Sequence, residues 1–144
     1  VGGLSKMYDY HCTVLRIVDG DTLDVDIDLG FSTVLKKQRI RMYGIDTPES
    51  RTRNKEEKVR GLLSKHFLQD LCPVGSTVRL DSHGKGKFGR ILGEIYTSDD
   101  DRNINQLMCS EGYAVEYGGG NKADLELLHQ ANKEKLIASG ILKV

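Results

Sequence analysis

The chain has 144 residues, 38% of them hydrophobic, and its 21 basic and 21 acidic side chains give a formal net charge of zero. A chain of this length is expected to form one domain that buries about 68–70% of its unfolded surface around a single core. The charge balance argues against a protein whose main task is to coat nucleic acid non-specifically.

Strand patterns come first along the chain. A run rich in Val, Ile, Thr and Tyr predicts a strand from Tyr8 to Val18, followed by a turn at Asp19-Gly20. The next segment has the period of a half-buried strand, with Leu23, Val25, Ile27 and Leu29 on one face and Asp24, Asp26 and Asp28 on the other. We interpret these aspartates as solvent-facing, because an EF-hand beginning at Asp24 would need glycine and glutamate where Leu29 and Leu35 stand.

A third strand is predicted over Thr33–Tyr43, with Arg39 and Arg41 on one of its faces. Shortly after it, Asp46-Thr47-Pro48-Glu49 places two carboxylates three positions apart around a proline. Pro48 has no backbone N–H and disfavours a helical residue before it, so the chain must turn here in a rigid corner. Carboxylates held at such a corner can bind a divalent cation or a water molecule.

Helices and two more strands are predicted for the rest of the chain. Apolar residues at three- and four-residue spacing predict a helix from Lys55 to Leu71 before Pro73, with one apolar face made of Val59, Leu62, Leu63, Phe67 and Leu71. Asn103 is expected to cap a second helix through Glu111, and a third should span Asp124 to Ser139.

The two later strands are expected over Ser76 to Asp81 and Phe88 to Tyr96, joined by a turn at Gly84-Lys85-Gly86. Five short strands with hairpin-like spacing predict a small barrel. The acidic triplet Asp99-Asp100-Asp101 is interpreted as a turn between a strand and a helix.

The cysteines bear on the compartment. Cys12, Cys72 and Cys109 are odd in number and lack CxxC spacing, so we expect buried free thiols, which slightly favours a reducing compartment and leaves the localisation unknown. No apolar run approaches the length of a membrane span, and residues 1–6 lack the hydrophobic stretch of a signal peptide. No membrane partner is therefore expected.

Three motifs carry a resemblance to a known family: Asp19-Gly20-Asp21-Thr22, then Arg41 with Asp46-Thr47-Pro48-Glu49, then Lys87-Phe88-Gly89-Arg90. In this order and spacing they resemble the motif set of the staphylococcal nuclease (thermonuclease) family. The resemblance covers most of the chain, from about Tyr10 to Lys133-Glu134-Lys135-Leu136. It implies an α+β fold, a five-stranded OB-type β-barrel with three α-helices, formed by residues 1–144 as a single domain.

The same resemblance implies a calcium-dependent endonuclease that hydrolyses phosphodiester bonds of DNA or RNA, with Ca²⁺ as cofactor, single strands preferred and a monomeric state. It implies that the Asp21 and Asp46 side chains and the Thr47 carbonyl bind the ion. Arg41 and Arg90 would flank the phosphate, and Glu49 would act on the attacking water, either as a general base or by positioning it. These residue types suit the chemistry, because guanidinium groups match phosphate oxygens and Ca²⁺ prefers carboxylate and carbonyl oxygens.

Some positions depart from the family pattern. Phe88 stands where the family often has tyrosine, although Lys87 keeps its charge as a candidate substrate-binding residue. Tyr117 is similar to the family's aromatic residue beneath a base, but the following Gly118-Gly119-Gly120 shortens that region, so base stacking and plain packing both stay open for it. The segment Ser50 to Glu57 matches poorly and is expected to be a mobile, basic loop. The neutral charge predicts weaker and more salt-sensitive substrate binding than in strongly basic members.

Two other functions stay open. OB barrels bind single strands, so the chain could be a catalytically inactive nucleic-acid-binding module, or it could be a protein-interaction module. Each motif alone also has an ordinary structural explanation: Arg41 could lie on the polar face of a strand, and Asp46 with Pro48 could form a simple turn. The family side chains at positions 21, 41, 46, 49 and 90 are all present, which favours the enzyme.

Overall fold

Five strands of the chain close into a β-barrel. The computed structural model describes residues 8–118 and 121–142, apart from the side chains of Lys87 and Lys122. The barrel strands are β1 (Tyr8–Asp19), β2 (Thr22–Gly30), β3 (Thr33–Met42), β5 (Thr77–Lys85) and β6 (Ile91–Thr97), in the order β1-β2-β3-β6-β5. Neighbouring strands are antiparallel except β3 and β6, which run parallel.

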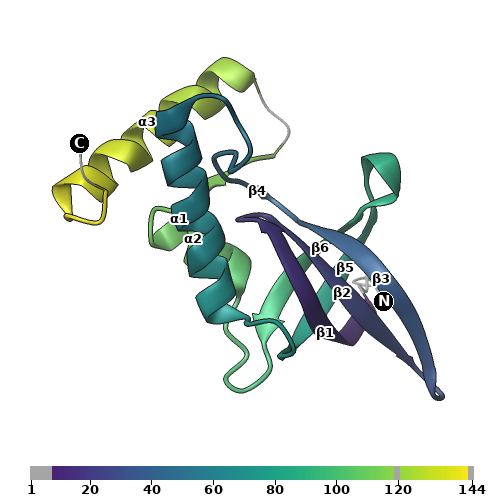
Figure 1. Ribbon diagram of the computed structural model, residues 1–144. Helices are drawn as coiled ribbons and strands as arrows, with labels where there is room; N and C mark the ends of the chain where they lie inside the picture. Colours follow the sequence, from purple (N-terminus) through teal and green to yellow (C-terminus); the bar gives the residue numbers. More distant parts are fainter. Residues whose placement is uncertain (1–7, 119–120, 143–144) are drawn as a thin grey trace, which may run out of the picture.

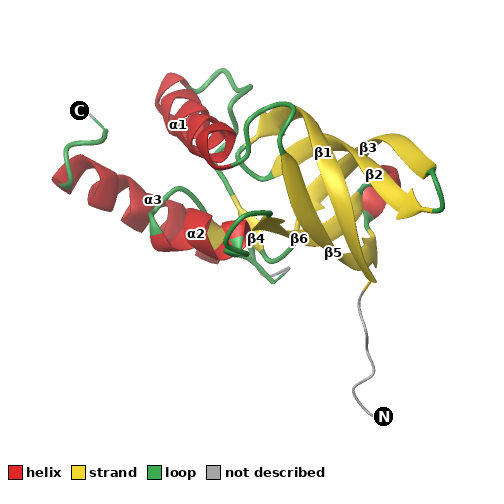
Figure 2. Ribbon diagram, turned by 90° about the horizontal axis from the view of Figure 1, so that it is seen from below, coloured by secondary structure: helices red, strands yellow, loops and turns green. Residues whose placement is uncertain are grey.

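Three helices lie together on one side of this barrel (Figures 1 and 2). They are α1 (Lys55–Leu71), α2 (Ile104–Ser110) and α3 (Lys122–Ala138). Two short strands, β4 (Ile45–Asp46) and β7 (Val115–Glu116), pair with each other as a separate sheet. The predicted α+β fold, with a closed five-stranded barrel and three helices, is confirmed.

An asparagine caps each helix. The side chains of Asn54, Asn103 and Asn121 accept hydrogen bonds from backbone N–H groups of the first turns, which satisfies donors that have no partner within the helix. Because Asn121 is the cap, α3 begins two residues before the predicted Asp124. No helix in the described part of the chain is long and apolar enough to cross a membrane.

The barrel core consists of the inward-facing residues of the strands. Val14, Leu23, Val25, Ile40, Leu80 and Ile95 are fully buried. The aspartates of β2 face outward, as predicted, and two of them pair with β3: Asp24 with Arg39 at 2.8 Å and Asp26 with Lys36 at 3.6 Å. Leu29 is 41% exposed because β2 and β3 continue past the core as a projecting hairpin (Figure 1).

The buried face of α1 differs from the predicted one. Val59 is 49% exposed, and the residues buried in this helix are Arg60, Gly61, Ser64 and Leu68. The small ones allow a close approach: a Cβ on Gly61 would lie 2.3 Å from the backbone oxygen of Glu49. A Cβ on Gly20 would likewise lie 2.7 Å from the Cβ of Ser64. The smallest residues of α1 therefore pack directly against the loops that carry the predicted site.

The connection between β5 and β6 also differs from the prediction. Gly84 and Lys85 belong to β5, where they pair with Leu92 and Ile91 of β6. The turn is instead the short 3₁₀ helix η1 (Lys87–Gly89), in which Phe88 has a φ of 61° and an almost fully exposed ring. Strand β6 begins at Ile91, not at Phe88, because the longer β5 moves the turn towards β6.

Several smaller predictions can be compared with the structure. The predicted loop Ser50 to Glu57 is too long at its C-terminal end, because Lys55 begins α1, and Ser50 lies in the loop with its side chain buried. The three cysteines are free; Cys12 and Cys72 are buried and Cys109 is partly buried. The acidic triplet lies in the turn between β6 and α2, as predicted. Gly119 and Gly120, and residues 1–7, lie outside the described residues.

Candidate active site

The candidate site lies where the β1–β2 turn, the end of β3 and strand β4 meet. Asp21 occupies the turn, Arg41 the penultimate position of β3, and Asp46 the end of β4. The backbone N–H of Met42 donates to the carbonyl of Asp21 at 2.8 Å, which fastens the turn to the end of β3. Residues far apart along the chain are thus brought to one corner of the barrel.

Arg41 joins the two aspartates. Its Nη2 lies 3.3 Å from Oδ2 of Asp21 and 3.2 Å from Oδ1 of Asp46. Its Nη1 donates to the carbonyls of Met42 at 3.0 Å and Ile45 at 2.9 Å, and the side chain is 17% exposed. Both carboxylates therefore converge on the same guanidinium nitrogen.

Asp21 is a buried carboxylate with several partners. Its oxygens accept hydrogen bonds from the Thr22 hydroxyl at 2.9 Å and the Thr47 backbone N–H at 3.1 Å. Burial nevertheless raises the pKa of Asp21, and the nearby Asp46 raises it further, while Arg41 and the two hydrogen bonds act in the opposite direction. The charged form of Asp21 is thus held in an environment that resists negative charge.

Glu49 lies close to the same group of negatively charged side chains. Partial burial raises its pKa first, and four neighbouring carboxylates, those of Asp19, Asp21, Asp46 and Glu57, raise it further. The side chain lies on the exposed side of the corner. Carboxylates this close to one another repel, and a bound cation would relieve that repulsion.

Thr47 brings an unpaired buried polar atom to the same corner. Its side chain is only 4% exposed, and its hydroxyl oxygen is the one buried side-chain polar atom without a hydrogen-bond partner among the described residues. Buried polar atoms are seldom left unpaired in folded proteins. The orphaned oxygen lies on the residue that follows Asp46 and whose N–H binds Asp21.

The oxygen atoms at this corner would suit a calcium ion better than a transition metal. No three His, Cys, Asp or Glu side chains of the described residues group together as a complete metal site. Asp21 and Asp46 together with the Thr47 carbonyl would give an all-oxygen, incomplete set. Calcium accepts such a set, because it takes six to eight oxygen ligands in irregular geometry and fills the remainder with water or substrate oxygens.

Arg90 and Lys87 belong to the connection between β5 and β6. In the parallel pairing of β3 with β6, Leu92 is level with Arg41, so Arg90 precedes the level of Arg41 by two positions. The Arg90 guanidinium lies 6.0 Å from the Phe88 ring centroid, and its carbonyl accepts the N–H of Gly86 at 2.7 Å. Lys87 begins η1, and its side chain is outside the described set.

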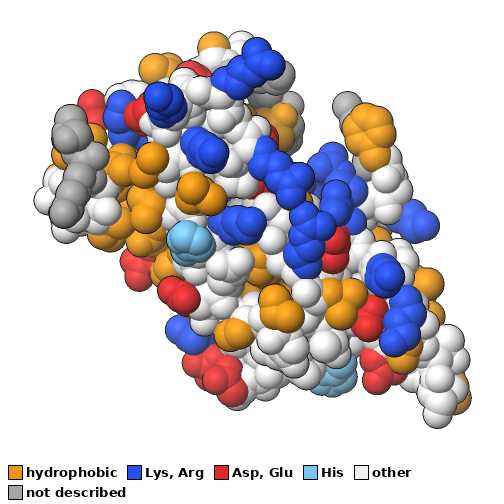
Figure 3. All heavy atoms as spheres, viewed as in Figure 1, with side chains coloured by type: hydrophobic (Ala, Val, Ile, Leu, Met, Phe, Trp, Pro, Cys, Tyr) orange, Lys and Arg blue, Asp and Glu red, His pale blue; other side chains and the backbone are white. Residues whose placement is uncertain are grey.

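Lys and Arg side chains gather on the face seen in Figure 3, around the hollow beside the projecting β5–β6 loop. Acidic side chains show between them. This face of a formally neutral chain is therefore suited to a polyanion.

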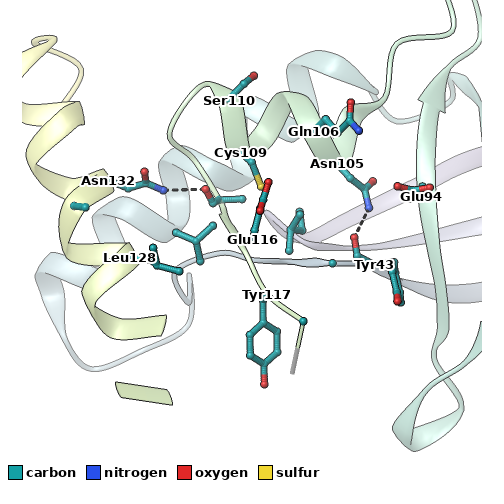
Figure 4. Close-up of a pocket in the computed structure, with 16 residues that line it drawn as sticks. Tyr43, Glu94, Asn105, Gln106, Cys109, Ser110, Glu116, Tyr117, Leu128 and Asn132 are labelled. Atoms are coloured by element: carbon teal, nitrogen blue, oxygen red, sulfur yellow. Dashed lines mark hydrogen bonds between the residues drawn. The ribbon is translucent and has the colours of Figure 1, made fainter. Parts of the chain in front are cut away.

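Tyr117 belongs to a part of the molecule whose lining residues do not include Asp21, Asp46 or Glu49. It lines a separate cavity of about 940 Å³ whose walls include Tyr43, Glu94, Asn105, Glu116 and Leu128 (Figure 4). The Tyr117 N–H donates to the carbonyl of Gly44 at 2.8 Å, which ties this cavity to the segment just before β4. The ring of Tyr117 points away from α2 (Figure 4). The cavity and the carboxylate cluster thus lie against the same short segment of chain.

Sequence reasoning missed two residues that hold the site. Asp19 accepts hydrogen bonds from both the hydroxyl and the N–H of Ser50, and so anchors the residue after Glu49. His129 of α3 contacts Oδ2 of Asp46 through Nε2 at 2.8 Å. The role of Asp19 could have been predicted, since this residue opens the Asp-Gly-Asp-Thr motif. His129 carries no local signal, because its partner is 83 positions away in the chain.

Comparison with known proteins identifies relatives of the chain. A family model described as staphylococcal nuclease homologue matches residues 39–137. An Escherichia coli protein described as an uncharacterized endonuclease is 34% identical over 109 residues, which cover 76% of this chain and 62% of that protein. A thermonuclease of Staphylococcus hyicus is 30% identical over 135 residues, which cover 92% of this chain and 75% of that protein.

A third relative, Endonuclease YhcR of Bacillus subtilis, is 32% identical over 116 residues, which cover 76% of this chain and 9% of that protein. The chain therefore spans less than two thirds of the length of the Escherichia coli relative and a small part of the Bacillus subtilis one.

Proposed function

The chain belongs to the staphylococcal nuclease family, and from this premise we propose that it is a nuclease that hydrolyses phosphodiester bonds of DNA or RNA with Ca²⁺ as cofactor. The observation that carries the proposal is the convergence of Asp21 and Asp46 on one nitrogen of Arg41. Carboxylates can hold a cation and a guanidinium can bind a phosphate, and phosphodiester hydrolysis benefits from both.

The proposed ligands of the ion are the Asp21 and Asp46 side chains and the Thr47 carbonyl, with water and substrate oxygens completing the set. When bound, the ion supplies positive charge beside the phosphate and lowers the pKa of a water molecule. Arg41 and Arg90 bind the phosphate oxygens, where two fixed guanidinium groups stabilise the charge that grows in the phosphorane-like transition state.

Glu49 acts on the attacking water in this proposal. The water must lose a proton as its oxygen attacks phosphorus, and a carboxylate beside it can accept that proton or hold the water in line. Burial and the neighbouring carboxylates raise the pKa of Glu49, which makes its ionised form a better proton acceptor than an exposed glutamate.

Substrate contacts outside the reacting phosphate are assigned to Lys87 and Tyr117. Lys87 would contact a neighbouring phosphate, and Tyr117, which lines the adjoining cavity, would stack on a base. Stacking requires an unpaired base, so we propose that single strands are preferred. Residues 1–144 are proposed to act as a single domain and a monomer.

The test is cleavage of single-stranded DNA and RNA by the wild-type chain, with Ca²⁺ or with a chelator. Cleavage with Ca²⁺ alone is the expected result. Glu49→Gln and Arg90→Ala should each lower the rate at least ~10²-fold while the fold stays intact. The first removes the group that acts on the water, and the second removes a positive charge that stabilises the transition state. The matched controls are Glu134→Gln on the exposed side of α3 and Arg16→Ala on β1, which should cleave at the wild-type rate.

The same experiment separates the enzyme from the other two functions. Binding of single strands without cleavage, with Ca²⁺ and with chelator alike, would show a nucleic-acid-binding module. If the protein neither binds nor cleaves single strands, the protein-interaction module is the function that remains. A Glu49→Gln rate close to wild type would refute the role given to that residue.

A further inference from the structure

His129 is a buried polar residue of α3 that the proposed reaction does not use directly. Its side chain is 11% exposed, and its Nε2 lies 2.8 Å from Oδ2 of Asp46. Oδ1 of the same carboxylate contacts Arg41 at 3.2 Å. Each oxygen of Asp46 therefore has its own fixed partner, one from β3 and one from α3.

We propose that His129 is a positioning residue, which holds the Asp46 carboxylate in the orientation that binds the cation. The inference rests on the proposed function, because Asp46 is a ligand only if the site binds Ca²⁺. Hydrogen-bonding partners behind a metal ligand orient it, and losing one costs about 10- to 100-fold in metal affinity. A histidine that donates from Nε2 to a carboxylate oxygen is such a partner.

Asp46 needs outside support because its own strand is short. Strand β4 has two residues and pairs only with the equally short β7. The Asp46 side chain is 25% exposed, so the surrounding packing alone does not fix the rotation of its carboxylate. Ordering this group before the ion arrives lowers the entropy lost on binding.

His129 can provide that support because the next turn of α3 is itself anchored to two other elements. Asn132 donates to the carbonyl of Ala114 at 2.8 Å, next to β7, and Lys133 pairs with Glu56 of α1 at 3.3 Å. His129 shares a small cavity with Pro48, in the corner that follows Asp46. The imidazole is thus a rigid link between the C-terminal helix and the candidate metal site.

The test compares variants of α3 in the full chain. His129→Ala removes the donor, and His129→Gln places an amide N–H where Nε2 was. The matched control Asn132→Ala removes a different anchor of α3 without touching Asp46. The affinity for Ca²⁺ is measured without nucleic acid, from the Ca²⁺-dependent rise of the thermal unfolding midpoint, and the Ca²⁺ dependence of cleavage is measured in parallel.

We expect His129→Ala to weaken Ca²⁺ binding about 10- to 100-fold, and His129→Gln to restore most of it. Asn132→Ala should keep the wild-type affinity even if it unfolds at a lower temperature. Wild-type affinity in His129→Ala would overturn the inference and leave the proposed function standing. An equal loss in Asn132→Ala would also overturn it, because docking of α3 would then be the whole cause.

A second measurement covers the case in which His129→Ala does not fold. In wild-type protein labelled with ¹⁵N, the Nε2–H signal of His129 should be present with chelator and should shift when Ca²⁺ is added. A missing or unresponsive signal would overturn the inference. A wild-type chain that binds no Ca²⁺ by either measurement would overturn the proposed cofactor, and the inference with it.

Discussion

At the scale of single residues, Asp21 combines two requirements that oppose each other. It is 7% exposed, which disfavours its charge, and yet the proposed site needs that charge. Arg41, the Thr22 hydroxyl and the Thr47 N–H compensate only partly, because the pKa of Asp21 is still raised by burial. In the absence of a cation, ionised Asp21 should therefore cost stability.

This leads to a prediction for Asp21→Asn. A carboxyl whose pKa is raised in the folded state stabilises the fold at pH values below its unfolded pKa, and that contribution is lost as pH rises through the folded pKa. With chelator, the free energy of unfolding of the wild type should thus fall, relative to Asp21→Asn, as pH increases from about 4 towards 7. Denaturant titrations across this range measure it.

Addition of Ca²⁺ should reverse the order of the two proteins. The wild type should gain stability as the ion binds, whereas Asp21→Asn should gain little, because it lacks one of the charged ligands. Wild-type protein that is the more stable one at neutral pH with chelator would contradict the account of Asp21.

The sequence allowed part of the site to be predicted at this scale. Asp21, Arg41, Asp46 and Thr47 are in direct contact, and their motifs lie at strand ends where turns can bring them together. His129 could not be predicted, because a helix surface gives no sign of a partner 83 positions away. Tyr117 lies in the neighbouring cavity, which only the packing of α2, α3 and β7 defines.

At the scale of elements, the contact between α1 and the Asp-Thr-Pro-Glu corner controls the geometry of the site. Gly61 lets the helix backbone approach Glu49 and Ser50 so closely that a Cβ would lie 2.4 Å from the carbonyl carbon of Glu49. That backbone cannot yield easily, because Asp19 anchors Ser50. The helix and the corner therefore keep one fixed spacing.

Gly61→Ala should separate them. Alanine favours a helix over glycine by about 1 kcal/mol, but overpacking at a rigid contact costs about 1–3 kcal/mol, so we expect a net loss of stability. The displaced corner should also lower the cleavage rate. Gly118→Ala is the matched control, because a Cβ there meets nothing within 4 Å. Thermal unfolding and cleavage assays on both variants check this, and an active, fully stable Gly61→Ala would contradict it.

The boundaries of α1 followed from periodicity, but its contact with the Asp-Thr-Pro-Glu corner did not. The helix over residues 55–71 and the alternation in β2 were predicted from the spacing of apolar side chains. Such patterns register large apolar residues, whereas the buried face of α1 is made partly of Gly61 and Ser64. The β5–β6 turn was misplaced for a related reason, since Gly84 lies within a strand rather than in the turn.

At the scale of the whole molecule, charge is concentrated locally while the total is balanced. Single-stranded nucleic acid releases counterions in proportion to the phosphates contacted, with a salt slope of about −0.7 for each. Lys85 is exposed at the end of β5, next to the β5–β6 connection, whereas the charge of Lys36 is offset by Asp26 at 3.6 Å. These two lysines should therefore contribute differently to binding.

We predict that Lys85→Gln makes the salt slope of DNA binding shallower by about 0.7, because it removes one phosphate contact. Lys36→Gln should leave the slope unchanged. Both are measured in a Glu49→Gln background, so that the strand is not cut, by titration at several NaCl concentrations. An equal effect of the two substitutions would argue against the hollow beside the β5–β6 loop as the nucleic-acid path.

The closed barrel also bears on the order in which the molecule assembles. The β1–β2–β3 meander uses neighbouring segments and can form early, whereas the parallel β3–β6 pair and the docking of α3 on Asp46 join distant parts of the chain and must come later. An incompletely folded chain would carry Asp21 and Arg41 on the formed meander but lack His129, the α3 partner of Asp46. The proposed cleavage of nucleic acid should thus begin only after α3 has docked, which would spare nearby RNA while the chain is being synthesised.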